Sequence, residues 1–286
     1  MILIPPIINI FLLSLVAGLG TGLGGLIAIL RKPGRRSFGF LMGAASGVML
    51  SLSFLELVNE AWELSGFGTA TIGFSAGAFF MLLIDFFIPH IRFGEKETRE
   101  PVESRNAAKT NFHPHQHGYG HGRRHGFWRN RLEEDSNPRL VRTGLLLAVG
   151  ITIHNIPEGI AVGAGFMHMP EFGFFIATAI LLHNIPEGIA TALPLCTGGV
   201  CRWDSFRMAL FSGLAEPIGA LAAALLLNFF RGLVPFSLAF AGGVMVFITL
   251  DELIPTAREY GHQHFTAIGI ILGSVFVFLL SGLLGV

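Results

Sequence analysis

The sequence predicts an all-α integral membrane protein with eight transmembrane helices. Of its 286 residues, 52% are hydrophobic and only 13% are charged, which lies outside the usual balance of a soluble domain. A helix that crosses a bilayer needs about 20 mostly apolar residues. Stretches of this kind lie at residues 5–30, 38–61, 67–91, 141–167, 172–199, 205–230, 234–257 and 265–285. The lipid bilayer is therefore the first partner that the sequence predicts.

Basic residues predict the orientation of these helices. Four of them lie within 31–36, after the first stretch, and eleven lie within 92–142, between the third and the fourth. Of the 19 lysines and arginines, only Arg231 falls on the other side. Because Lys and Arg collect on the cytoplasmic side of membrane proteins, we expect both termini to be extracytoplasmic.

Neither the N-terminus nor the cysteines point to another class of protein. The chain is apolar from its first residues, without a basic region or a cleavage site, so we expect a first span and not a signal peptide. Cys196 and Cys201 lie near the cytosolic end of the fifth stretch, where thiols stay reduced. A disulfide is not expected.

The predicted organisation is one membrane domain interrupted by one loop. Residues 1–91 carry helices 1–3, and residues 141–286 carry helices 4–8. The segment 92–140 is predicted to be a disordered cytoplasmic loop because its composition cannot bury a core. It contains a histidine-rich tract at 113–125. Such tracts bind metals, so both a weak metal sensor and a plain solvated linker remain open.

Two further segments repeat each other. Gly47–Leu50 leads to Phe54–Leu57 in the second stretch, and Gly243–Val246 leads to Leu250–Leu253 in the seventh, at a constant offset of 196 residues. The two stretches run through the membrane in opposite directions. Similar sequence in opposite orientation predicts an inverted repeat (3+2+3), which is common in alternating-access carriers.

The most informative motif is a hexapeptide that occurs twice. His154–Gly159 and His183–Gly188 both read His-Asn-Ile-Pro-Glu-Gly and start 29 residues apart. Each histidine and its glutamate are spaced i, i+4 and share a helix face. With a rise of about 1.5 Å per residue, both motifs fall near the middle of the membrane. Polar residues at that depth are costly and are usually functional.

A third carboxylate and two prolines that interrupt helix hydrogen bonding are also predicted near the middle of the membrane. Glu216 lies at a similar depth in the sixth stretch, next to Pro217. Pro157 and Pro186 have no N–H to donate. The carbonyl groups that they leave free are tolerated only where they line a cavity.

Imidazole and carboxylate groups together favour Zn²⁺, Fe²⁺ or Mn²⁺, and the lack of thiolate or methionine clusters argues against Cu⁺. For each polar residue the alternative is an interhelical hydrogen bond, an interpretation that applies most to the two asparagines. The candidate metal ligands are His154, Asn155, Glu158, His183, Asn184, Glu187 and Glu216.

The paired His-Asn-x-Pro-Glu-Gly motifs resemble those of the Zrt/Irt-like (ZIP) divalent-metal transporters, in particular the bacterial GufA-like branch. The resemblance extends over nearly the whole chain, including the eight spans and the histidine-bearing loop. It implies a multi-pass protein of the bacterial inner membrane that imports a divalent metal ion toward the cytoplasm, with zinc as the expected ion and iron, manganese and cadmium ions left open as alternatives. It also implies an elevator-like motion of one helix bundle against the other.

The resemblance further implies a binuclear site between helices 4, 5 and 6. His154, Glu158, His183 and Glu187 would hold one metal ion. Asn155, Asn184 and Glu216 would hold a second, with Glu158 and Glu187 bridging the two. Some relatives carry Asp or Gln at the positions of Asn184 and His183. The amide of Asn184 lowers the negative charge of the second position.

Other acidic residues are placed along a transport pathway. Glu56 is predicted near the outer surface, whereas Glu252, its repeat partner, is predicted near the inner surface beside Asp251. We interpret them as entrance and exit carboxylates, with solvated helix ends as the alternative. Asp85 and His90, near the inner end of the third stretch, either line the same exit or end the helix.

Two other classes of membrane protein compete with a transporter. An intramembrane zinc metalloenzyme usually shows His-Glu-x-x-His on one helix, and the chain lacks that string, so no enzyme is predicted. A proton-conducting or sensor protein would use the His–Glu pairs to relay protons. A selective metal channel with the same ligands is a further alternative to a carrier. No nucleic-acid partner is expected.

The first stretch is rich in glycine, at Gly18, Gly20, Gly22, Gly24 and Gly25. Its G-x-G-x-x-G match lacks the strand–helix context of a dinucleotide site. It is better interpreted as a close-packing surface, and such surfaces would permit a homodimer.

Overall fold

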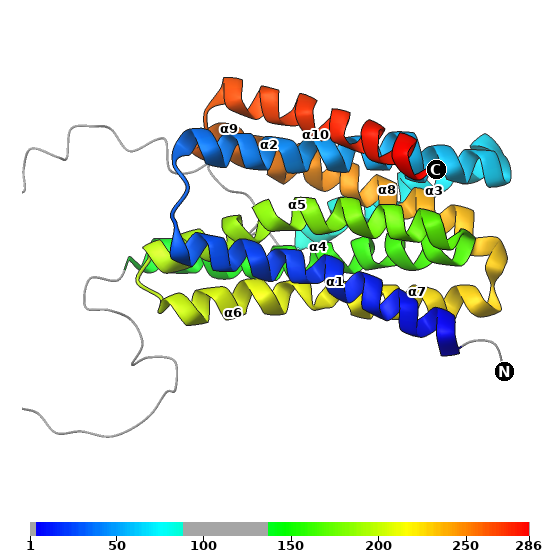
Figure 1. Ribbon diagram of the computed structural model, residues 1–286, viewed down its shortest axis with the longest axis horizontal. Coiled ribbons are helices and arrows are strands. Elements are labelled where there is room, and N and C mark those ends of the chain that lie inside the picture. The colour runs from blue at the N-terminus through cyan, green and yellow to red at the C-terminus, as the bar shows by residue number, and fades with distance from the viewer. Residues whose placement is uncertain (1–3, 88–136, 286) are drawn as a thin grey trace, which may run out of the picture.

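The computed structural model describes residues 4–87 and 137–285, and every element within them is a helix (Figure 1). The long helices are α1 (Ile4–Leu30), α2 (Arg35–Ser51), α3 (Val58–Phe87), α4 (Pro138–His168), α5 (Pro170–Thr197), α6 (Arg202–Gly213), α7 (Ala215–Phe229), α8 (Val234–Ile248) and α10 (Gln263–Leu284). The shorter elements are α9 (Ile254–Tyr260), the 3₁₀ turn η4 (Arg231–Leu233) and two π-helices, η1 (Leu52–Leu57) and η5 (Thr249–Leu253).

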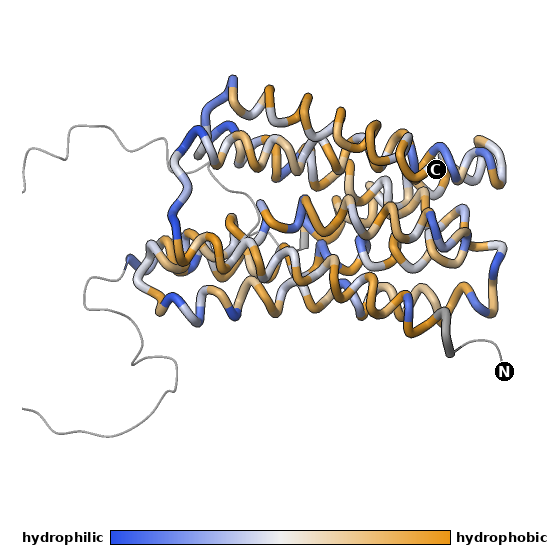
Figure 2. The backbone as a smooth tube through the Cα atoms, in the orientation of Figure 1, coloured by the Kyte–Doolittle hydropathy of each residue, from blue (hydrophilic) through white to orange (hydrophobic). Residues whose placement is uncertain are grey.

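Seven helical stretches of the described chain are long and apolar enough to cross a membrane. Hydrophobic residues run along most of their lengths, and hydrophilic ones lie near the ends and at some places in the middle (Figure 2). Large apolar side chains also cover the outside. On α1, for example, Ile8, Leu12, Val16, Leu19 and Leu23 are all exposed. Such a continuous apolar surface suits lipid and would be unfavourable in water, so the prediction of an all-helical membrane protein is confirmed.

The stretch Arg35–Phe86 is a hairpin and not a single rod. A straight helix of its 52 residues would be about 78 Å long, far more than the ~30 Å of a bilayer core. Gly66 interrupts it with φ 77° and ψ 170°, a conformation that only glycine adopts readily. The rings of Phe54 and Phe74, on either side of Gly66, lie 5.8 Å apart. The chain therefore turns back at Gly66, between the second and third predicted spans.

Two predicted spans are less regular than the sequence suggested. The stretch 205–230 is divided at Leu214 into α6 and α7. Pro217 then falls in the first turn of α7, where a missing N–H costs nothing. The stretch 234–257 changes from α8 to the π-helix η5 and then to α9. Both irregularities lie beside predicted functional carboxylates, Glu216 and Glu252.

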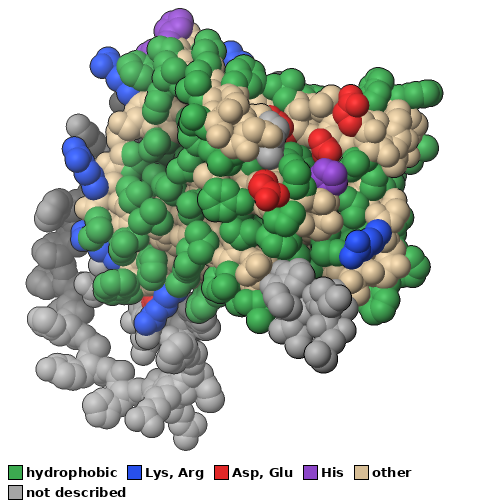
Figure 3. Space-filling model, turned by 45° about the vertical axis from the view of Figure 1, so that its right-hand side comes forward, with side chains coloured by type: hydrophobic (Ala, Val, Ile, Leu, Met, Phe, Trp, Pro, Cys, Tyr) green, Lys and Arg blue, Asp and Glu red, His purple; other side chains and the backbone are tan. Residues whose placement is uncertain are grey.

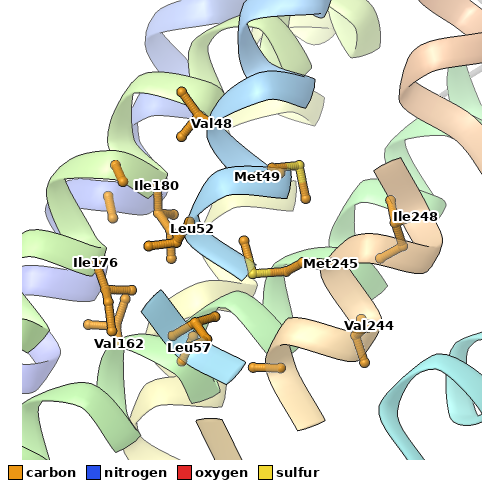
Figure 4. Close-up of a cluster of buried hydrophobic side chains, with 14 of the residues drawn as sticks. Val48, Met49, Leu52, Leu57, Val162, Ile176, Ile180, Val244, Met245 and Ile248 are labelled. Atoms are coloured by element: carbon orange, nitrogen blue, oxygen red, sulfur yellow. The ribbon is translucent and has the colours of Figure 1, made fainter. Parts of the chain in front are cut away.

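The helices form two bundles. The first contains α1 and α4–α7, and the second contains α2, α3 and α8–α10 (Figure 1). They meet along a seam where α5 packs against α2, and α4 against α8. The seam is filled by buried apolar side chains (Figure 4). Those labelled in the figure are Val48, Met49, Leu52, Leu57, Val162, Ile176, Ile180, Val244, Met245 and Ile248.

The packing along the seam is incomplete on one side. A cavity of about 350 Å³ lies between α5 on one bundle and α2 and α10 on the other. Its walls are almost wholly apolar and include Val48, Leu182 and Phe276, and it reaches His183. Within each bundle, by contrast, glycines bring helix backbones into direct contact.

Those glycine contacts follow the 196-residue offset of the predicted inverted repeat. A side chain on Gly47 of α2 would strike the Ile270 carbonyl of α10, and one on Gly243 of α8 would strike the Phe74 carbonyl of α3. Each of the two residues in the first contact lies 196 residues from its counterpart in the second. The offset also relates Gly73 to Gly269, which pack on Phe236 and Phe40, and it brings η1 almost into register with η5. The repeat therefore includes α3 and α10 as well as the two segments that the sequence pointed to.

Candidate metal centre

The two hexapeptides lie in the middle of α4 and α5, and both prolines are accommodated inside continuous helix. Gly159 and Gly188 let neighbouring helices approach closely. A side chain on Gly159 would strike the Glu216 backbone of α7, and one on Gly188 would strike the Thr21 backbone of α1. The motifs are thus fixed between α7 on one side and α1 on the other. The close-packing interpretation of the glycine-rich first stretch is borne out here, because Gly18, Gly20 and Gly24 also contact neighbouring backbones.

The histidines and glutamates of the motifs meet at the α4–α5 contact. Glu158 Oε1 lies 3.2 Å from His154 Nε2 and 3.0 Å from His183 Nε2. Glu187 Oε1 lies 3.5 Å from His154 Nε2. All four side chains are buried. Glu158 therefore sits between two imidazoles that come from different helices.

These separations suit a shared metal ion. Ligand atoms about 2.0–2.2 Å from a tetrahedral zinc ion are roughly 3.3 Å apart, and the three distances between imidazole nitrogens and carboxylate oxygens, 3.0, 3.2 and 3.5 Å, lie on either side of that value. Ligand atoms of His154, Glu158 and Glu187 all lie within 4.8 Å of one another. Neither oxygen of Glu187 accepts a hydrogen bond from the described residues. Buried carboxylates in that condition are strongly unfavourable, which a cation would relieve.

The two asparagines use one end of the amide for structure. Asn155 Nδ2 donates to the Ser212 carbonyl at 2.8 Å. Asn184 Nδ2 donates to the Ala17 carbonyl at 3.1 Å and to Glu216 Oε2 at 3.0 Å. Neither Oδ1 atom is hydrogen-bonded within the described chain, nor is Glu216 Oε1. The amide nitrogens thus form the interhelical hydrogen bonds of the alternative interpretation, and the assignment of the oxygens as metal ligands stays a prediction.

A local two-fold symmetry relates the halves of this centre. Advancing the α4 motif by 29 residues gives the α5 motif, and advancing α1 by 195 residues gives α6 and α7. The Asn155–Ser212 contact then corresponds to Asn184–Ala17. Under the same relation Glu216 corresponds to Thr21, which is fully buried and whose hydroxyl has no partner in the described chain. One half of the centre carries a carboxylate where the other carries a hydroxyl.

The predicted pathway residues are divided between two places. Glu252 is close enough for its charge to act on His154, Asp85 and Glu187, and Asp251 is its exposed neighbour in η5. Asp85 is buried, and its Oδ1 has no hydrogen-bond partner among the described residues. Glu56 is separate from them, hydrogen-bonded to Ser281 and near Glu60. His90 and the histidine-rich tract lie outside the described residues.

Sequence reasoning does not identify Thr21 in this centre or a polar pair elsewhere in the protein. A threonine in an apolar helix is unremarkable on its own. The sequence pattern that points to Thr21 is the similarity between Ala17-Gly18-Leu19 and Ser212-Gly213-Leu214, because their 195-residue offset places Thr21 at the position of Glu216. His168 and Glu60 are the polar pair, 2.8 Å apart. Cys196 and Cys201 are both free, as expected.

The chain is similar in sequence to known zinc transporters. Residues 3–281 match the family model described as ZIP Zinc transporter. The chain is 37% identical over 278 residues to the zinc transporter ZupT of Akkermansia muciniphila, with 93% of this chain and 94% of that protein covered. It is 39% identical over 289 residues to the zinc transporter ZupT of Corynebacterium efficiens, covering 97% of each. It is also 40% identical over 256 residues to the zinc transporter ZTP29 of Arabidopsis thaliana, covering 88% of this chain and 85% of that protein.

Proposed function

Because the chain belongs to the ZIP zinc transporter family, we propose that it carries zinc across the membrane through the buried centre between α4 and α5. It is a multi-pass membrane protein of a divalent-metal transporter family. One observation carries the specific proposal. Glu158 Oε1 lies 3.2 and 3.0 Å from the Nε2 atoms of His154 and His183, on two different helices.

The centre is proposed to bind two ions. His154, Glu158, His183 and Glu187 hold the first through imidazole and carboxylate atoms. The free amide oxygens of Asn155 and Asn184 and the free Oε1 of Glu216 hold the second, with Glu158 and Glu187 bridging. The two amide oxygens, Glu216 Oε1 and both oxygens of Glu187 are buried and lack hydrogen-bond partners in the described chain, which supports the assignment. The donor set also suits Fe²⁺, Mn²⁺ and Cd²⁺.

Transport is proposed to be import toward the cytoplasm by alternating access, as the family resemblance implies. The first bundle contains the metal centre and moves, whereas the second bundle stays fixed. The contact between the two bundles supports this division, because it consists of apolar side chains next to a cavity of about 350 Å³. Within each bundle, by contrast, glycines hold the helix backbones in direct contact. Asp85, Asp251 and Glu252 then line the exit toward the cytoplasm, and Glu56 lies at the entrance.

The proposed topology has eight spans with both termini outside, since the hairpin at Gly66 counts as two. Gly34 and Gly68 are suited to a test because both have open space where a side chain would point. In protein whose cysteines are replaced by serine, an impermeant maleimide should label Gly68→Cys in intact bacterial cells. Gly34→Cys should be labelled only after lysis. The reverse labelling pattern would contradict the topology.

The function itself is tested by uptake of radioactive zinc into proteoliposomes. We expect uptake that saturates with zinc concentration and is lost in Glu187→Ala, because two of the shared ligand atoms disappear. Glu171→Ala is the matched control, since Glu171 is an exposed glutamate at the start of the same helix. Zinc uptake by Glu187→Ala at the wild-type rate would overturn the proposal. Flux that does not saturate would replace the carrier by a channel.

Two other functions give different outcomes in the same vesicles. A proton-conducting protein would acidify or alkalise the lumen without added metal. A metalloenzyme would cleave a substrate without moving zinc. The relatives are named as transporters, and the residues around Glu158 come from two helices, unlike the His-Glu-x-x-His motif of a single-helix catalytic zinc site.

A further inference from the structure

One polar contact joins the two bundles away from the metal centre. His168 Nε2, at the last residue of α4, lies 2.8 Å from Glu60 Oε1 near the start of α3. The side chains are 24% and 29% exposed. His168 lies 14 residues beyond His154, which corresponds to about 21 Å along the helix. The contact is therefore separate from the centre between α4 and α5.

The surroundings of this pair are arranged like a ligand site. The ring of His168 packs edge-on against Phe172 with centroids 6.0 Å apart, which fixes the imidazole while Nε2 faces Glu60. Glu56, four residues before Glu60, is held by Ser281 and lies close enough to feel the charge of Glu60. In the space-filling view a histidine and several acidic side chains lie together on an otherwise largely hydrophobic face (Figure 3).

The chemistry of the pair matches the cargo. Imidazole nitrogen and carboxylate oxygen are the donors that zinc takes in proteins, about 3.3 Å apart in a tetrahedral shell. The two atoms need to separate by only about half an ångström to admit an ion between them. Both side chains are partly exposed, so there is room at the protein surface for further ligands, such as water, to complete the coordination shell.

We propose that Glu60 and His168 form a second divalent-cation site, built across the seam from one residue of each bundle. It lies at the end of the molecule opposite Arg35 and Arg36, which is the outer end in the proposed topology. An ion held there is on the side from which the central site is filled. The site is an external capture point, distinct from the paired hexapeptides.

Residue-level chemical protection tests this site in the detergent-solubilised full chain. Diethyl pyrocarbonate modifies free imidazole nitrogen, and mass spectrometry gives the rate for each histidine. Zinc is the only added metal, at about ten times its dissociation constant for the Glu60–His168 site. The rate of His168 modification should then fall roughly tenfold, because only about one site in eleven is free of zinc. The exposed His264 provides an internal reference.

Three variants make the result specific. Glu60→Gln should lose the zinc protection of His168, whereas Glu63→Gln, an exposed glutamate in the same helix, should keep it. Glu187→Gln should also keep the zinc protection of His168. Loss of zinc binding at the central site is therefore distinguishable from loss of zinc binding at the Glu60–His168 site. The proposal is overturned if zinc leaves the rate at His168 unchanged in wild-type protein. It is equally overturned if protection persists in Glu60→Gln or vanishes in Glu187→Gln.

Discussion

Glu158→Gln is expected to weaken zinc binding by at least about 100-fold while the protein stays folded. Loss of a group that only supports a metal ligand costs about 10–100-fold in affinity, and Glu158 is itself shared by both histidines. Glutamine keeps the size of the side chain and can still hydrogen-bond the imidazoles, so helix packing is retained.

Thermal unfolding in the presence of zinc measures this effect. At a zinc concentration about 100 times the wild-type dissociation constant, binding stabilises the wild type by about 2.7 kcal/mol, and a 100-fold weaker site leaves about 0.4 kcal/mol. Glu171→Gln, on the exposed part of α5, should retain the full zinc-dependent shift. An undiminished shift in Glu158→Gln would remove Glu158 from the ligand set.

Gly159→Ala is expected to destabilise the protein and to disable the centre at once. A methyl group there would strike the backbone carbonyl of Glu216, so α7 must move away from α4. Overpacking of a well-packed interior costs about 1–3 kcal/mol, and occasionally more. The shift would also displace Glu216 from Asn184, to which it is hydrogen-bonded at 3.0 Å.

The measurement is the unfolding temperature in detergent, together with zinc uptake. Gly68→Ala is the matched control because a side chain there meets no atom within 4 Å. It should leave both quantities near the wild-type values. If Gly159→Ala behaves like Gly68→Ala, the close approach of α4 and α7 does not position the centre.

Much of the centre could be predicted from the sequence because its polar residues are isolated in apolar helices. The i, i+4 spacing of His154 and Glu158, and of His183 and Glu187, predicts a shared face without any tertiary information. Glu216 could be included because its depth in the membrane follows from counting residues. The boundary between the second and third spans was also visible, and the turn lies at Gly66.

The arrangement of helices could not be predicted in the same way. Apolar surfaces of membrane helices resemble one another, so hydropathy does not say that α5 faces α2 or that α4 faces α8. The segments of η1 and η5 stand out in sequence through their acidic residues and their repeat, but no local pattern indicates that they form π-helices. His168 and Glu60 are 108 residues apart, and no local pattern connects them. The 195-residue offset between α1 and α6–α7 is a further sequence pattern, and it links Thr21 to Glu216.

The central claim is that the paired hexapeptides bind the transported ion. Anomalous scattering at the zinc edge, from crystals of the full chain grown with zinc, tests it most directly. The predicted result is a peak between α4 and α5, about 2.0–2.2 Å from His154 Nε2 and from a carboxylate oxygen of Glu158. Well-ordered density for both hexapeptides, with zinc peaks only elsewhere in the molecule, would contradict it.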